Sequence, residues 1–223
     1  MKTITKKFLG LTCITWCAAS AFFGLTPALG AAEEGWAPLF NGKDLEGWKQ
    51  INGRAKYEAK EGCIVGASVP NSPNSFLCTA KNYGDFELEF EVMVHPELNS
   101  GVQIRSESKP EYQNRRVHGY QVEIAIGGFS GGIYDEARRG KFLNAERPTD
   151  ELKALLKKDQ WNKYRVVCRG DHLETWVNGV KVTDLRDSMT ATGFIGLQVH
   201  GVGDRTDPLE VRWRNLRLRE FKG

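Results

Sequence analysis

The sequence predicts an all-β protein, an antiparallel β-sandwich or jelly roll with one short helix. Many short stretches alternate between apolar and polar residues, which is typical of strands that bury one face. Turn-forming residues separate these stretches along most of the chain. Helical segments do not alternate with the strands, so a parallel sheet built from βαβ units is not expected.

The first thirty residues are expected to form a secretory signal peptide rather than part of the fold. Lys2, Lys6 and Lys7 precede a mostly apolar run, and small residues at 28–30 mark a cleavage point near Gly30. The run is short and interrupted for a permanent membrane anchor. We therefore expect an exported protein, periplasmic or extracellular, with one domain over residues 31–223 and no stable membrane insertion.

The charge balance argues against polyanionic partners. The chain carries 31 basic and 28 acidic residues, a net charge of +3. The expected leader holds three lysines and no acidic residue, so the remaining domain is neutral. Neither nucleic acid nor an anionic membrane is an expected partner, and the sequence does not indicate the oligomeric state.

Strands are expected from the start of the domain to its end. The expected ranges are 36–40, 56–59, 63–66, 76–79, 86–94, 101–106, 119–126, 161–169, 172–177, 194–200 and 209–220. Gly170-Asp171 and Asn178-Gly179 predict tight hairpin turns, and a change of alternation near Asn215 predicts a bulge. The helix is expected over residues 148–157, with three leucines on one face.

Three cysteines remain after the leader. Cys63 and Cys78 are placed so that a disulfide would close a hairpin-sized loop, and the sequence leaves that pairing open. Cys168 alternates with Tyr164 and Val166, so it is expected to be a buried free thiol.

Three strands share a polar pattern that predicts a binding site. Each places aliphatic residues on one side and two hydrogen-bonding groups on the other. The polar pairs are Gln103 with Arg105, Gln121 with Glu123, and Gln198 with His200. In a sandwich the aliphatic sides face the partner sheet, so the polar groups meet on one outer face. We expect a carbohydrate-binding trough there; the alternative is an ordinary solvated sheet face.

Other residues are expected at the margins of this trough. Trp176 is expected to stack on a sugar, with Arg165 and Glu174 extending the trough, and His118 is expected to reach it. The loop that follows residue 133 is expected to form the rim, with Tyr134 and Arg138 contacting substrate. Its Asp135 and Glu136 either form a catalytic pair or only hold Arg138 and Arg139. Glu87, Glu89 and Glu91 are expected to be a solvated strand face.

A set of motifs makes the chain resemble the 3-keto-disaccharide hydrolase domain family. The matching segments are residues 36–45, 47–48, 86–88, 99–102 with Arg105, 119–124, 131–136, 161–162, 176–179, 196–201 and 214–216. The resemblance implies a concanavalin-like jelly roll, export, and hydrolysis of glycosides that carry a ketone at C3. The chain departs from the family where some relatives have an acid, at Ala125, and a tryptophan, near Lys141.

The implied chemistry assigns roles to the polar residues. A C3 ketone acidifies the C2 proton, so a base can remove it and the glycosidic oxygen can leave from C1. Glu123 or His200 is expected to be the base, and Asp135 or Glu136 the acid. Arg105, with Gln103 and Gln198, is expected to hold the enolate, a role that a divalent metal would also fill.

Two other functions are compatible with the sequence. A lectin-like module would bind carbohydrate in the trough without cleaving it. An ordinary retaining or inverting glycosidase would place a second carboxyl across the trough from Glu123.

Overall fold

The chain folds into two antiparallel sheets that enclose a common apolar core, which confirms the predicted fold class. The structure is a computed structural model that describes residues 3, 35–144 and 149–222. Residues Ala32–Gly223 form one unit, distinct from Met1–Ala31. The expected signal peptide lies outside the described residues except for Thr3, so its presence stays a prediction. Within the described residues, no helix is long and apolar enough to cross a membrane.

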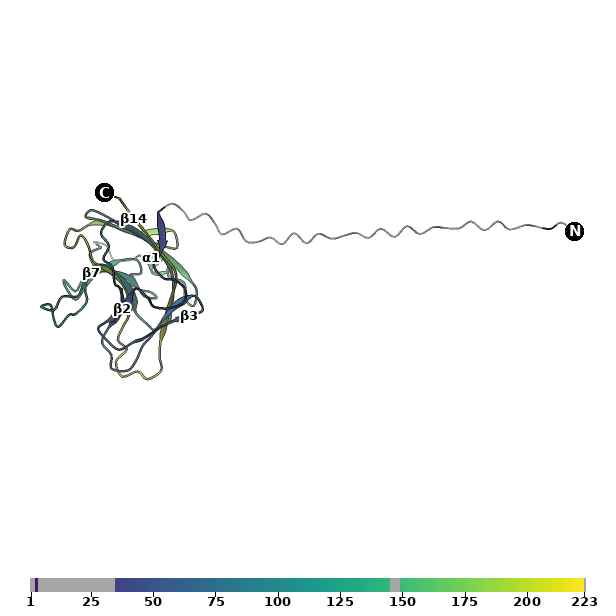
Figure 1. Ribbon diagram of the computed structural model, residues 1–223, viewed down its shortest axis with the longest axis horizontal. Coiled ribbons are helices and arrows are strands. Elements are labelled where there is room, and N and C mark those ends of the chain that lie inside the picture. The colour runs from purple at the N-terminus through teal and green to yellow at the C-terminus, as the bar shows by residue number, and fades with distance from the viewer. Residues whose placement is uncertain (1–2, 4–34, 145–148, 223) are drawn as a thin grey trace. The chain divides into compact units, whose positions relative to one another are not determined.

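The larger sheet contains eight strands, with β1 lying beside β14 (Figure 1). Its main order is β12-β11-β10-β6-β14-β4-β3, and β1 pairs with the C-terminal half of β14. The strands are β1 (Trp36–Pro38), β3 (Lys56–Lys60), β4 (Cys63–Ala67), β6 (Phe86–Val94), β10 (Asn162–Arg169), β11 (His172–Val177), β12 (Val180–Arg186) and β14 (Glu210–Glu220).

The smaller sheet contains six strands in the order β2-β5-β13-β7-β8-β9. They are β2 (Trp48–Ile51), β5 (Ser75–Thr79), β7 (Ser100–Glu107), β8 (His118–Ile124), β9 (Ile133–Glu136) and β13 (Phe194–Val199). The three strands with the polar pattern, β7, β8 and β13, are therefore neighbours at the centre of one sheet.

Alternation along β6 shows how the core forms. Phe86, Leu88, Phe90, Val92 and Val94 are all buried and face the other sheet. On the opposite face, glutamates pair with arginines from adjacent strands: Glu87 with Arg165 and Arg219, Glu89 with Arg217, and Glu91 with Arg214. This face is thus an ion-pair ladder rather than a plain solvated one.

The predicted turns and bulge are present. Asn178 and Gly179 join β11 to β12 with φ of +49° and +87°, the left-handed values that a two-residue hairpin turn requires. The register of β14 against β6 shifts between Arg214 and Arg217, and Asn215 has a φ of +52°. These left-handed positions explain why asparagine and glycine occur there.

The helix is shorter than predicted. It spans Asp150–Lys153 (α1), and its cap, Thr149, accepts a hydrogen bond from the Leu152 amide at 3.3 Å. Side chains form hydrogen bonds with the backbone groups that another helical turn would pair with each other. Asn178 Nδ2 donates to the Leu155 carbonyl at 2.7 Å, and the Lys157 amide donates to Asn162 Oδ1 at 2.7 Å.

All three cysteines of the described domain are buried free thiols. The Cys63–Cys78 disulfide that the sequence left open is therefore not formed. Burial raises the pKa of Cys168 to about 12, so this thiol is held in its neutral form.

Candidate functional site

The outer face of the smaller sheet is buried, unlike an ordinary solvated face. Gln103 and Gln198 are fully buried, Gln121 is 2% exposed and Glu123 is 6% exposed. Polar side chains are rarely buried unless they are hydrogen-bonded. This face is therefore a layer of buried polar side chains rather than an ordinary solvated surface.

A pocket of about 320 Å³ opens over this layer. Six of the residues predicted from the sequence line it: Gln121, Glu123, Tyr134, Glu136, Gln198 and His200. Four others that were not predicted as site residues complete it: Asn74, Asn99, Arg116 and Phe142. The pocket therefore draws on β8, β9, the end of β13 and four loops, which carry Asn74, Asn99, Arg116 and Phe142.

Glu123 lies on β8 with both carboxylate oxygens hydrogen-bonded. Asn99 Nδ2 donates to Oε1 at 2.5 Å, and Gln121 Nε2 donates to Oε2 at 3.1 Å. Burial raises the pKa of Glu123, and the nearby Glu136 adds to the rise. The two amide donors and His200 oppose it, without cancelling it. Glu123 is thus a fixed carboxyl with a proton affinity above that of a surface glutamate.

Glu136 is a second buried carboxyl in the same pocket. Its Oε1 lies 3.6 Å from Arg116 Nη2. Burial raises the pKa of Glu136, while Arg116, His200 and Asn74 oppose the rise. His200 is exposed at the mouth, with Nδ1 2.8 Å from the Gly201 carbonyl. Two carboxyls of raised proton affinity beside one guanidinium can exchange protons with a bound ligand.

Aromatic rings form one wall of the pocket. Phe142 stacks on Phe129 with ring centroids 4.2 Å apart, and Tyr134 meets Phe142 edge-on at 5.2 Å. Burial raises the pKa of Tyr134, and the neighbouring Glu136 and Glu123 raise it further, so its hydroxyl stays protonated and available as a donor. The Tyr134–Phe142 bridge that creates this wall joins β9 to a loop, which strand patterns do not reveal.

Three glutamine amides form the floor beneath Glu123. Gln103 Nε2 and Gln198 Nε2 donate to Gln121 Oε1 at 2.9 and 2.8 Å. Gln103 was expected to contact substrate, but it does not line the pocket and lies one layer below it.

Arg105 was expected to hold the enolate, but its guanidinium lies elsewhere. It donates to the carbonyls of Gly84 and Gly170 at 2.8 and 2.6 Å and pairs with Asp85 at 2.9 Å. The cause is a bulge: the β7–β8 register shifts after Ile104, and Arg105 has a φ of +45°. The side chain is thereby turned away from the polar layer and connects the two sheets.

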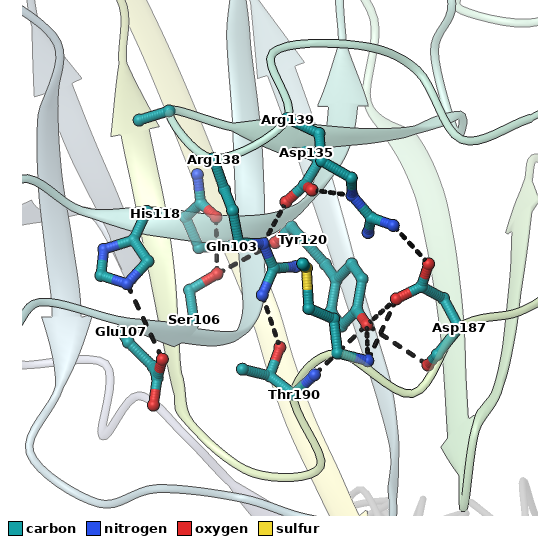
Figure 2. Close-up of polar contacts among 12 residues, drawn as sticks. Gln103, Ser106, Glu107, His118, Tyr120, Asp135, Arg138, Arg139, Asp187 and Thr190 are labelled. Carbon is teal, nitrogen blue, oxygen red and sulfur yellow. Dashed lines mark hydrogen bonds and ion pairs between the residues drawn. The ribbon is translucent and has the colours of Figure 1, made fainter.

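Asp135 is a structural carboxylate rather than a pocket residue (Figure 2). It is fully buried and pairs with both Arg138 and Arg139. Arg139 also pairs with Asp187 at 2.7 Å, and Tyr120 donates to the same aspartate. Of the two readings for this loop, Asp135 fits the bracing role and Glu136 remains in the pocket.

Arg138 and His118 also lie away from the pocket. Arg138 lies over the Tyr120 ring at 4.8 Å and donates to Thr190 Oγ1 at 3.4 Å. His118 is buried and stacks on Tyr112 at 3.9 Å. Its ring also faces Glu107 at 3.7 Å (Figure 2). Both were expected to contact substrate; instead they stabilise the surrounding loops.

Trp176 belongs to the other sheet, so it does not extend the trough. It lies on β11 opposite Arg165 on β10, whose guanidinium is 4.1 Å from its ring centroid. Arg165 and Glu174 are likewise on the larger sheet. The alternation of residues 172–177 predicts β11 correctly, but a single sequence does not show which sheet a strand joins.

Among the described residues, the histidine and acidic side chains of the pocket do not bring three ligand atoms close together. Within the described residues, only His172, Glu174 and Asp184 bring ligand atoms to within 4.8 Å of one another. They lie on β11 and β12, where Lys181 already pairs with both carboxylates. Glu123, Glu136 and His200 do not form such a group.

Comparisons with known proteins agree with the sequence resemblance. The family model described as a 3-keto-alpha-glucoside-1,2-lyase-like domain matches residues 35–219. A comparison with curated proteins gives no match.

Solved structures share the fold at low identity. Two candidate glycosyl hydrolases from Parabacteroides distasonis are 20% and 23% identical, with TM-scores of 0.61 and 0.59. The matches cover 85% and 83% of this chain and 95% and 99% of theirs. The carbohydrate-binding module CBM66 from Bacillus subtilis is 16% identical, with a TM-score of 0.57, over 78% of this chain and 95% of the module.

Proposed function

Since the chain belongs to the family of 3-keto-α-glucoside-1,2-lyase-like domains, we propose that it cleaves glycosides that carry a ketone at C3. Cleavage proceeds by loss of the C2 proton, elimination of the C1 substituent and addition of water. The observation that carries this proposal is the pocket itself, in which the buried carboxyls of Glu123 and Glu136 lie with the Arg116 guanidinium. We further propose that the protein acts after export, in line with the signal peptide expected from the sequence.

Glu123 is the base. Two amide donors fix its carboxylate, so its orientation is set before substrate arrives. Its raised pKa makes it a stronger base than a surface glutamate. It takes the C2 proton, and the electron pair of the C2–H bond forms the C2–C3 double bond of an enolate.

Arg116 replaces Arg105 as the cation that stabilises the enolate. It is the arginine that lines the pocket, and its guanidinium is exposed to a ligand there. A positive charge fixed near the C3 oxygen stabilises the negative charge that develops in the transition state.

Glu136 is the acid. Burial favours its protonated form. When the enolate returns to the ketone, its electron pair forms a C1–C2 double bond and the C1–O bond breaks. Glu136 gives its proton to the departing oxygen. Water then adds at C1 and gives one proton to the Glu136 carboxylate, while C2 regains a proton from Glu123. The products are a free 3-keto sugar and an alcohol, and both carboxyls return to their starting states.

Cleavage of 3-keto and unmodified glycosides in D₂O tests this proposal. We expect cleavage of the 3-keto substrate alone, with deuterium at C2 of the product as read by mass spectrometry and NMR. Glu123→Gln should remove both cleavage and exchange. Cleavage of the unmodified glycoside without deuterium at C2 would instead identify the two-carboxylate mechanism, for which Glu123 and Glu136 also share a pocket.

Glu87→Gln is the matched control. Glu87 is a buried glutamate, but it lies on β6 of the larger sheet and outside the pocket. This variant should keep both cleavage and C2 exchange. Treatment with a chelator, followed by addition of divalent metal, tests in the same assay whether a metal contributes.

A carbohydrate-binding module is the second candidate. The fold shared with CBM66 favours it, because that protein is a carbohydrate-binding module. Calorimetry that detects sugar binding, together with cleavage of neither substrate, would support the module and overturn the enzyme.

A further inference from the structure

The amide layer beneath the pocket has a defined direction. Gln121 Oε1 accepts two hydrogen bonds, from Gln103 Nε2 and Gln198 Nε2. A carbonyl oxygen has two lone pairs, so both are occupied. The NH₂ group of Gln121 must then face the other way, toward Glu123 Oε2. Ser106 Oγ donates to Gln103 Oε1 at 2.7 Å, which orients Gln103 as well.

A glycine creates the space for this arrangement. Gly101 on β7 lies opposite Gln198 on β13 and opposite Glu123 on β8. A Cβ at Gly101 would lie 2.6 Å from Gln121 Cγ and Cδ and 2.8 Å from its Nε2. The missing side chain therefore lets Gln121 lie across β7 between its three partners. The sequence motif at residues 99–102 thus supplies both Asn99 and Gly101 to the same carboxylate.

We propose that Gln121 is a positioning residue for Glu123 rather than a substrate contact: Gly101, Gln103 and Gln198 fix its amide so that it donates to the Glu123 carboxylate. This inference rests on the proposed function, because it assigns Glu123 as the base. A carboxylate accepts such a bond better than a neutral carboxyl does, so the amide layer favours the charged form that abstracts a proton.

Several charged or titratable groups face Glu123 and bear on its protonation. Glu136 and Tyr134 come from β9, His200 follows β13, and Arg116 precedes β8. From the larger sheet, the Tyr164 hydroxyl donates to the Glu123 backbone carbonyl at 3.4 Å. Of these, Glu136 raises the pKa of Glu123 and His200 lowers it. None of these groups is altered by a change at Gly101 or Gln121, so such variants isolate the amide donor.

The test is the titration of Glu123 itself. The protein is labelled with ¹³C at glutamate side chains, and the Glu123 signal is assigned by its loss in Glu123→Gln. We expect Gln121→Met and Gly101→Ala each to raise the midpoint by about one pH unit, since a donor to the charged form is lost. Circular dichroism checks that each variant folds, and either variant alone is decisive.

Two control variants separate positioning from packing. Gln103→Met removes one of the two hydrogen bonds to Gln121 Oε1, but the bond from Gln198 Nε2 remains, so the amide keeps its orientation and its donor to Glu123. Gly196→Ala adds a methyl group in the same sheet, where the nearest atom, Cys78 Sγ, is 3.1 Å away. Both should leave the Glu123 midpoint near its wild-type value. An unchanged midpoint in Gln121→Met or Gly101→Ala, or an equal change in the controls, overturns the inference.

The pH dependence of kcat/KM provides a second test of this inference. The acid limb of the kcat/KM profile on a 3-keto glucoside should move upward by the same amount, which is a tenfold loss at pH values below the limb. A loss of equal size at every pH would show a substrate contact and contradict the inference. If the wild type cleaves no 3-keto glycoside, the proposed function fails, and the NMR titration still decides whether Gln121 controls Glu123.

Discussion

Asp187 links the loop that precedes β13 to the loop after β9, and its replacement by asparagine should destabilise the fold at neutral pH. Burial alone would raise the pKa of Asp187. Hydrogen bonds from Arg139, Tyr120 and the Met189 amide outweigh that effect and hold the pKa at about 2, against an ordinary value of 3.8. The ionised carboxylate is therefore more stable in the folded chain than in the unfolded one.

The size of the effect follows from this difference. One pKa unit corresponds to about 1.4 kcal/mol, so ionised Asp187 contributes about 2 kcal/mol to the free energy of unfolding. The side chain is 17% exposed, so solvent screening reduces this value only in part. Because the folded pKa is the lower one, the contribution is complete well above pH 4 and is lost as the pH falls toward 2.

Urea unfolding of the wild type and Asp187→Asn at several pH values measures this contribution. The difference in free energy should be about 2 kcal/mol at pH 7 and should fall to about half by pH 3. Asp184→Asn is the control, because Asp184 also has a pKa of about 2 but is exposed on the surface. Its loss should be smaller and should disappear at high salt. A difference for Asp187→Asn that is the same at every pH would refute the electrostatic origin.

Three further substitutions test other parts of the structure. Arg105→Met should lower the free energy of unfolding by about 3 kcal/mol in urea, because it removes the side-chain donor to two carbonyls and the ion pair with Asp85; a loss below about 1 kcal/mol would contradict its role in connecting the two sheets. Gly179→Ala should cost about 1 kcal/mol in thermal unfolding, since its φ is +87° and a Cβ would meet no atom within 4 Å; an unchanged stability would refute the strain argument. Phe142→Ala should raise KM for the 3-keto substrate several-fold with a smaller change in kcat, because it removes part of the pocket wall; a fall in kcat alone would show that the ring acts in the chemical step.

Alternation in the sequence was sufficient to predict the sandwich and the polar face of its smaller sheet. Four polar residues alternate with aliphatic neighbours along their strands, and all four line the pocket: Gln121, Glu123, Gln198 and His200. Alternation no longer predicts the direction of a side chain where the backbone departs from regular strand geometry. The bulge at Arg105 moves that side chain out of the layer, so a residue with the correct spacing has a different environment.

Other parts of the site depend on information that a single sequence does not contain. Trp176 has a suitable side chain on a correctly predicted strand, but that strand belongs to the larger sheet. Arg116 enters the pocket from a loop in which Gln113, Asn114 and Arg115 all have positive φ, a conformation that no residue pattern indicated. Asn74 and Phe142 likewise come from loops, whose paths depend on long-range packing.

The pocket brings together side chains that are far apart along the chain, from Asn74 to His200. The β8–β9 hairpin contains both carboxyls, but Asn74, Asn99 and Gln198 come from other segments, so no hairpin or short fragment holds the complete site. Contacts between distant segments form slowly, since the chain must first lose the entropy of closing long loops. The site therefore forms only as the central strands of the smaller sheet complete their pairing. Recovery of ligand binding during refolding would thus report the final step of assembly, after secondary structure has appeared.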